Sequence, residues 1–321
     1  MIRLVGTELT RYRVRRATGL VVLLAVLAAA AIAALTAWES RPLTRTEIAT
    51  AQVKASQDSD RTDIQADLDK CLKDPVKYLG PGATEQQCRD ALVPAAQSYL
   101  PREPLDLRGT LRGNGIGVAL LVAALLIIGA SAFAGGDHAS GSITNQVLFA
   151  PGRARLWSAK AIAVGAWSAL VAAVTLGGFW LTLYLVAADR DVPHGSAIVD
   201  DICWHVVRGV LFCAGAGIGA YALTMLFRHA FATLGLLFAY SVGGEVVLAL
   251  AQSDKVARWT LGNNVFGWLE TRLQYVGSRR CEIDECPGAA HLGHLDAGIY
   301  LLVLLTVSCL ASVLVFRRRD L

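Results

Sequence analysis

The chain has 321 residues, of which 54% are hydrophobic and only 17% are charged, and its mean hydropathy is +0.47. Soluble proteins carry about 25% charged residues, so this composition excludes an ordinary soluble domain and indicates a membrane protein. The formal net charge is +4, and no basic run is interleaved with aromatic residues. Nucleic acid is therefore not expected among the partners of the chain.

Six apolar segments have about the 20 residues that a helix needs to cross the hydrocarbon core of a bilayer. They cover residues 17–38, 115–134, 161–187, 204–227, 231–252 and 297–316. Because lipid offers no hydrogen-bond partner to an open strand edge, all six are expected to be helices. The predicted fold class is an all-α membrane protein with six transmembrane helices and a helical insertion between the first two.

The basic residues of the short loops predict the orientation of the chain. They gather in residues 1–16, 135–160 and 317–319 and at Arg228. Residues 188–203 hold four aspartates against one arginine. Both termini are therefore expected in the cytoplasm, with the protein in the bacterial plasma membrane. A cleaved signal peptide is the alternative for the first 38 residues, but the apolar run is long and no small-x-small site follows it.

Residues 1–16 predict a short amphipathic helix at the inner surface of the membrane. Ile2, Val5, Leu9 and Tyr12 recur at helical spacing, and arginines occupy the remaining faces. Such a helix places its apolar face among acyl chains and its arginines on lipid phosphates. A disordered basic tail is the alternative.

Residues 39–112 form the predicted external insertion, in which a Gly-Pro-Gly break separates two helical faces. We expect a helical hairpin closed by a Cys71–Cys88 disulfide, because thiols oxidise outside the cytoplasm. Cys281 and Cys286 are expected to form a second disulfide in the other external segment. Neither pair has CxxC spacing, so no metal site is predicted.

The second external segment, residues 253–296, is rich in aromatic residues but too broken to span a membrane. It predicts one or two short helices that dip into the outer leaflet, with tryptophans at headgroup depth. His291, His294 and Asp296 lie in this segment and are expected to face solvent rather than to bind a metal.

Two ionisable residues lie inside the predicted spans, where burial of a charge is costly and often functional. Arg208 and Glu245 differ in height by about 7 Å when counted from the turn that joins their helices, at about 1.5 Å per residue. We therefore expect them to pair, either in a translocation path or as a lock on the hairpin.

No phosphate loop of the GxxxxGK[ST] type occurs, so the chain is expected to bind no nucleotide or other cofactor and not to be an enzyme. The polar, basic loop 135–160 contains a segment compatible with a helix from Ser140 to Ala150. Ser140 or Asp137 is expected to cap this helix, and Pro151 to end it.

One face of that helix is apolar, with Ile143, Val147 and Ala150. This face is expected to dock in a cleft of a partner protein. An ordinary basic loop without a partner is the alternative.

The order of residues in this loop resembles that of the ABC-2-type permeases, the membrane subunits of type V ABC exporters. The order is an acid, Gly-Ser, a short apolar helix, Pro, a basic residue and a Lys at the next span, with matching residues Asp137, Gly141, Ser142, Ile143 to Leu148, Pro151, Arg153 and Lys160. Asp137 stands where the family more often has Glu, and the external insertion is long for the family.

The resemblance implies an ATPase-coupling surface made by Asp137, Gly141, Ser142, Ile143, Val147, Leu148, Pro151 and Arg153. It also implies a dimer of permease subunits bound to two ATPase subunits, which carry ATP and magnesium. The leading hypothesis is therefore a permease that exports a hydrophobic or amphipathic substrate. The alternatives are a membrane-anchored sensor or assembly protein that presents residues 39–112, and a self-contained carrier or membrane enzyme.

Overall fold

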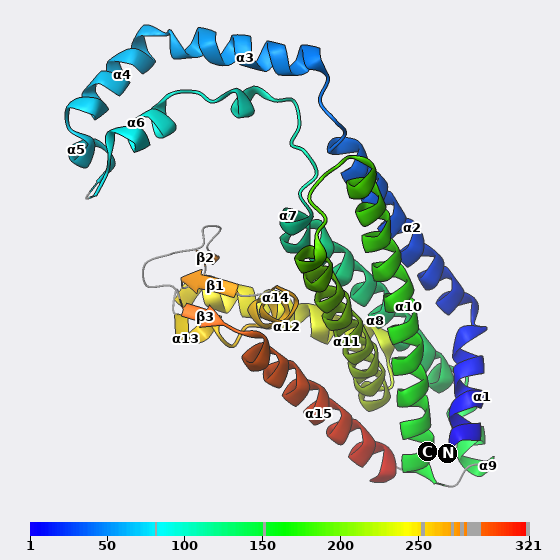
Figure 1. The fold of residues 1–321 in the computed structure, drawn as a ribbon. Helices are drawn as coiled ribbons and strands as arrows, with labels where there is room; N and C mark the ends of the chain where they lie inside the picture. Colours follow the sequence, from blue (N-terminus) through cyan, green and yellow to red (C-terminus); the bar gives the residue numbers. More distant parts are fainter. Residues whose placement is uncertain are drawn as a thin grey trace. The chain divides into compact units, whose positions relative to one another are not determined.

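The computed structural model describes residues 1–80, 82–149, 152–251, 254–270, 273–276, 279–280 and 290–318. The chain forms two compact units (Figure 1). The first contains Met1–Ala34 and Leu107–Leu321, and the second contains Leu35–Asp106.

Six helical segments in the described part of the chain are long and apolar enough to cross a membrane. They are α2 (Arg16–Glu39), α7 with α8 (Leu107–Arg112 and Asn114–Ala139), α10 (Arg153–Asp189), α11 (Ser196–Phe227), α12 (Ala230–Ala251) and α15 (His294–Arg318). The six predicted spans are thereby confirmed, and the chain is a multi-pass membrane protein. Several helices are longer than predicted. The 37 residues of α10 extend about 56 Å, against about 30 Å for a hydrocarbon core.

Small residues allow the long helices to pack closely. A Cβ atom at Gly209 of α11 would lie 2.7 Å from Leu176 Cδ1 of α10, and one at Gly217 would lie 2.5 Å from Ser168 Oγ. Without a hydrophobic driving force between helices in lipid, the van der Waals contacts that such close backbone approach allows favour helix association.

One end of the first unit is closed by α1 (Ile2–Arg13) and α9 (Ser142–Phe149), and the N-terminus and the last turn of α15 lie there (Figure 1). We call it the Asp137 end, after the residue in the last turn of α8. Its apolar core includes Tyr12, Phe133, Trp157 and Tyr221. The Tyr221 hydroxyl donates a hydrogen bond to the Trp157 carbonyl oxygen at 3.2 Å, so α10 and α11 are joined inside this core.

The segment between α12 and α15 contains α13 (Asp254–Ala257) and α14 (Leu261–Leu269), in agreement with the prediction of short helices. It also contains three short strands, β1 (Leu273–Val276), β2 (Arg279–Arg280) and β3 (Ala290–Leu292). They form an antiparallel sheet in the order β2-β1-β3, with Gln274 opposite His291. The chain is therefore mainly helical rather than all-α. Strands of two to four residues are too short to show an alternating pattern in the sequence.

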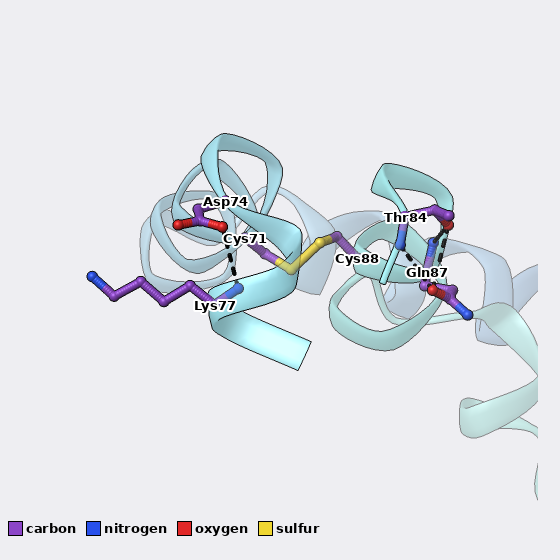
Figure 2. The surroundings of a disulfide bond; sticks show 6 residues. All are labelled: Cys71, Asp74, Lys77, Thr84, Gln87 and Cys88. Atoms are coloured by element: carbon purple, nitrogen blue, oxygen red, sulfur yellow. Dashed lines mark hydrogen bonds between the residues drawn. A yellow bond between two sulfur atoms is a disulfide. The ribbon is translucent and has the colours of Figure 1, made fainter. Parts of the chain in front are cut away.

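The second unit is built from short helices, namely α3 (Arg45–Ser59), α4 (Thr62–Lys73), α5 (Pro75–Leu79), α6 (Glu85–Leu92) and the 3-10 helix η1 (Ala96–Tyr99). A Cys71–Cys88 disulfide joins α4 to α6 (Figure 2). Thr84 caps α6 by accepting a hydrogen bond from the Gln87 amide. The predicted hairpin and its disulfide are confirmed, whereas Cys281 and Cys286 lie outside the described residues.

An arginine near the end of the second unit holds its beginning in place. Arg102 pairs with Glu47 of α3 at 2.7 Å and donates to the carbonyl oxygens of Arg41 and Pro42. This pair lowers the pKa of Glu47 to about 2, chiefly through the hydrogen bond from Arg102. The first and last parts of the unit are thus joined without a large apolar core.

Candidate functional site

Asp137 is the centre of a buried group of charges at the Asp137 end. Its side chain is only 1% exposed. It pairs with Lys160 of α10, with Arg15, which lies between α1 and α2, and with Arg11 of α1, whose Nη2 is 3.3 Å from Oδ1. Three elements that are distant in the sequence therefore meet at one carboxylate.

Glu8 of α1 is the second carboxylate of this group. Its side chain is 4% exposed, and its Oε2 lies 2.9 Å from Lys160 Nζ and 3.0 Å from Arg11 Nη1. We call Glu8, Arg11, Arg15, Asp137 and Lys160 the charge cluster. Because a buried charge is tolerated only when it is paired and hydrogen-bonded, these contacts explain how α1 is held against α8 and α10.

An aromatic ring of α8 completes the surroundings of the cations. The Phe133 ring centroid is 4.7 Å from Arg15 Cζ and 4.9 Å from Lys160 Nζ, so both cations face its π-electrons. Arg15 Nη1 also donates to the Phe133 carbonyl oxygen at 3.1 Å. A Cβ atom at Gly136 would lie 2.8 Å from this Nη1, and the glycine leaves room for the guanidinium.

The charge cluster has three cations and two carboxylates, so its formal net charge is +1. Lys160 and both acids are buried, while the Arg11 and Arg15 side chains are 31% and 29% exposed. The surplus positive charge is therefore presented by the two arginines at the molecular surface.

Helix α9 is attached to the charge cluster through polar side chains. Ser142 Oγ accepts hydrogen bonds from Arg11 Nη2 at 3.3 Å and from Gln146 Nε2 at 2.6 Å. Gln146 Nε2 is also 3.5 Å from Asp137 Oδ2. The turn into α9 is made by Gly141 at φ +64°, in the left-handed region that glycine adopts without a Cβ penalty.

The predicted caps of this helix are wrong. Ser140 is the C-cap residue of α8, and its hydroxyl donates a hydrogen bond to the Gly136 carbonyl oxygen at 2.8 Å. Asp137 lies in the last turn of α8 and pairs with the cations of the charge cluster. Because α8 continues beyond the predicted span, both residues are used before α9 starts at Ser142. Pro151 and Ala150 lie outside the described residues, and Arg153 begins α10.

The predicted docking face of α9 also differs from the structure. Ile143 is only 3% exposed, and both it and Val147 pack against the core of their own chain. Among the apolar side chains of α9 that the structure describes, the exposed one is Leu148, at 76%. Helical periodicity locates an apolar face, but it does not show whether that face meets the same chain or another one.

The predicted pair of Arg208 and Glu245 is not formed. Arg208 Nη1 contacts the His294 ring, 3.2 Å from Nδ1, and the Arg208 carbonyl oxygen accepts a bond from Trp268 Nε1. Glu245 is exposed on α12. A difference in height along two helices does not fix the rotation of each helix about its axis, and this rotation turns Arg208 toward α14 and α15. Because Arg208 contacts its ring, His294 is half-buried and does not face solvent as predicted.

Sequence reasoning missed Glu8, Arg11 and Arg15 as site residues. Their signal was present, because Glu8 is the lone acid among the first 16 residues and shares a helical face with Arg11 and Tyr12. Tyr12 is fully buried beside Phe133, with ring centroids 4.8 Å apart. Burial raises the pKa of Tyr12, so its phenol remains protonated.

No group of three or more metal-binding side chains occurs in the part of the chain that the structure describes. Comparison with known proteins found no matching family model, no matching curated protein and no matching solved structure. The charge cluster, α9 and the six spans are therefore the basis for a functional assignment.

Proposed function

We propose that the chain is the permease subunit of an ATP-driven exporter in the bacterial plasma membrane, with both termini and the Asp137 end in the cytoplasm. Two separate ATPase subunits dock at this end, and their ATP and magnesium supply the energy. The substrate is a hydrophobic or amphipathic molecule that moves out of the cytoplasm or the inner leaflet. The observation that carries this proposal is the attachment of α9 to α1, α8 and α10 through the charge cluster.

The arrangement suits the transmission of a push from a partner. A displacement of α9 acts through Ser142 on Arg11 of α1, and through Gln146 on Asp137 of α8. Asp137 and Glu8 both pair with Lys160, so the same displacement reaches α10. Movement at one short surface helix is thereby passed to three elements of the bundle.

The surface around α9 has the features of a docking site for an acidic partner. Leu148 offers an exposed apolar side chain, and the partly exposed Arg11 and Arg15 carry the surplus charge of the cluster. Exposed apolar anchors with adjacent charges are characteristic of specific protein interfaces.

The test is co-purification of the ATPase subunits with a tagged permease. Leu148→Arg should reduce the recovered ATPase about tenfold or more, since it places a charge in an apolar contact. Val76→Arg is the matched control, because Val76 is 52% exposed in the second unit, and this change should leave recovery unaltered. Full recovery of the ATPase with Leu148→Arg, or full activity of the chain without any ATPase, overturns the proposal.

A second permease copy is proposed to cover α12. Glu245 is exposed on this span beside Val242 and Val246, and an acid facing lipid is costly. Disulfide cross-linking of Val246→Cys in native membranes should yield a dimer, whereas Leu302→Cys on α15 serves as the exposed control. Equal cross-linking at both sites contradicts a specific dimer through α12.

The sensor or assembly function remains a second candidate because residues 35–106 form a compact unit with its own disulfide. Replacing residues 45–100 by a flexible linker separates the two functions. Retained ATPase binding with retained export favours the permease without a sensor. The sensor is favoured if the linker variant still folds but loses a downstream response, and if no ATPase is recovered with either the unmodified chain or the variant.

A further inference from the structure

A pocket of about 500 Å³ opens at the Asp137 end between α8, α9 and the turn that joins α11 to α12. Its walls include Gly135, Ile143 and Phe231. This volume falls within the range of about 300–1,000 Å³ that small-molecule sites occupy. The pocket is separate from the charge cluster, whose five residues do not line it.

The ionisable side chains that line the pocket in the described part of the chain are all basic. Arg228 and His229 line it from the turn, and His138 lines it from α8, while none of its described lining residues is acidic. His138 Nε2 is buried and has no hydrogen-bond partner among the described residues. Arg228 forms no ion pair with a described carboxylate, in contrast to Arg11 and Arg15.

The backbone adds further donors to the same place. Arg228 ends α11 in the left-handed conformation, at φ +61°, which turns the chain directly into α12. Ala230 and Phe231, in the first turn of α12, line the pocket, and the amides of a first helical turn have no partner within the helix. Together with Arg228 and the histidines they form a set of donors suited to an anion.

The rim of the pocket is apolar on the side of the spanning helix. Phe231 is 78% exposed at the start of α12, and the His229 ring packs on it with centroids 5.7 Å apart. An anion that is attached to acyl chains would place its charged group among the basic residues and its chains along α12. A free anion would make no use of this rim.

We infer that the pocket binds the phosphate headgroup of an anionic phospholipid from the leaflet at the Asp137 end. Basic pockets between transmembrane helices are suited to such headgroups. Because Ile143 and Thr144 of α9 line the pocket, a bound headgroup braces α9 against α12. The lipid thereby sets the position of the helix that is attached to the charge cluster.

The experiment measures phosphatidylglycerol retained by the purified full chain, by native mass spectrometry, after exchange into phosphatidylcholine nanodiscs with limiting phosphatidylglycerol. Arg228→Asn removes the charge and keeps a residue that tolerates the left-handed conformation. It should lower retention about fivefold, the factor that one basic residue near an anionic lipid surface contributes. Arg13→Asn, an exposed cation outside the pocket, is the matched control and should leave retention unchanged.

A second pair of variants controls for loss of lipid that is caused by misfolding. Ala139 is exposed and lines the pocket, so Ala139→Glu adds a repelling charge, while Ala139→Gln adds the same bulk without charge. Only the Glu variant should lose phosphatidylglycerol. Equal retention by the Glu and Gln variants, or by Arg228→Asn and Arg13→Asn, overturns the inference. Displacement of the lipid by millimolar inorganic phosphate or glycerol phosphate overturns it in favour of a soluble anion. Displacement by a bound ATPase subunit overturns it in favour of a protein contact.

Discussion

Asp137 shows at the scale of one residue why the charge cluster needs all of its members. Its carboxylate faces three cations, and among the described residues Glu8 is the other acid that pairs with them. Removal of one partner from a buried ion pair costs about 3–5 kcal/mol, because the charge that remains is buried without compensation. The cost of each substitution therefore depends on the charge that it leaves behind.

The charge count predicts an order of stabilities. Asp137→Asn leaves three cations with one acid and should lower the free energy of unfolding by about 3–5 kcal/mol. Lys160→Met leaves two arginines with two acids and should cost less. Denaturant unfolding in detergent micelles measures both. Asp200→Asn, an exposed acid of α11, is the control and should change stability by less than about 0.5 kcal/mol. A larger cost for Lys160→Met than for Asp137→Asn contradicts this account of the cluster.

Gly141 provides a second prediction, which concerns the backbone. Its φ of +64° costs a residue with a Cβ atom about 1–2 kcal/mol, so Gly141→Ala should destabilise the turn into α9 by that amount. Gly117→Ala is the matched control, because Gly117 lies inside α8 with no neighbour within 4 Å of the added Cβ atom. Thermal unfolding should show a lower midpoint for the first variant and an equal or higher midpoint for the second. Equal effects contradict a requirement for glycine at position 141.

Helices α4 and α6 show, at the scale of elements, how a small hairpin is held together. Their apolar contact is limited to the disulfide with Leu68 and a few partly buried neighbours. A core of this size cannot offset the entropy of ordering the two helices, so a covalent bond is needed. The hairpin is correctly predicted by sequence because its helical faces, the Gly-Pro-Gly break and its cysteines are local signals.

Loss of the Cys71–Cys88 disulfide should therefore unfold this hairpin. The bond closes a loop with a sequence separation of 17 residues, for which chain entropy predicts about 3 kcal/mol. Hydrogen exchange of residues 62–92 should accelerate strongly in the Cys71→Ala, Cys88→Ala double variant. Exchange in α10 and α11 should not change. Cys203→Ala, which removes an exposed free thiol, is the control. Unchanged exchange in the double variant shows that packing alone is sufficient.

The whole molecule consists of two units whose stabilities have different origins. The first unit depends on close helix packing and on the charge cluster, and the second depends on a disulfide and on the Arg102–Glu47 pair. The pKa of Glu47 is lowered to about 2 from 4.5, so the pair contributes stability above pH 4.5. This contribution is lost as the pH falls through about 2.

Acid should accordingly open the second unit in a way that Arg102 controls. Pepsin cleavage within residues 35–106 should increase only as the pH approaches 2 in the unmodified chain. In Arg102→Gln it should increase at a higher pH, nearer the ordinary value of Glu47. Lys70→Gln removes one partner of an exposed pair with Asp67 and is the matched control. Identical cleavage profiles for Arg102→Gln and the unmodified chain contradict a role of the pair in closing the unit.

The amino-acid sequence by itself determined the six spans and the hairpin with its disulfide. These features depend on local properties, namely runs of apolar residues, helical periodicity and the spacing of the cysteines, whereas the turn at Gly141 lies where the sequence had indicated a helix. The sequence also located Asp137 and Ser142, although it assigned Asp137 a local role as a helix cap.

Only the tertiary structure decided which distant residues meet. Lys160 and Glu8 are separated by 152 positions, and Arg15 and Asp137 by 122. Their pairing depends on the packing and rotation of whole helices, which no local pattern records. The same rotation turns Ile143 inward and Arg208 toward His294. Charge and hydropathy thus specify which side chains need a partner, whereas three-dimensional packing selects the partner.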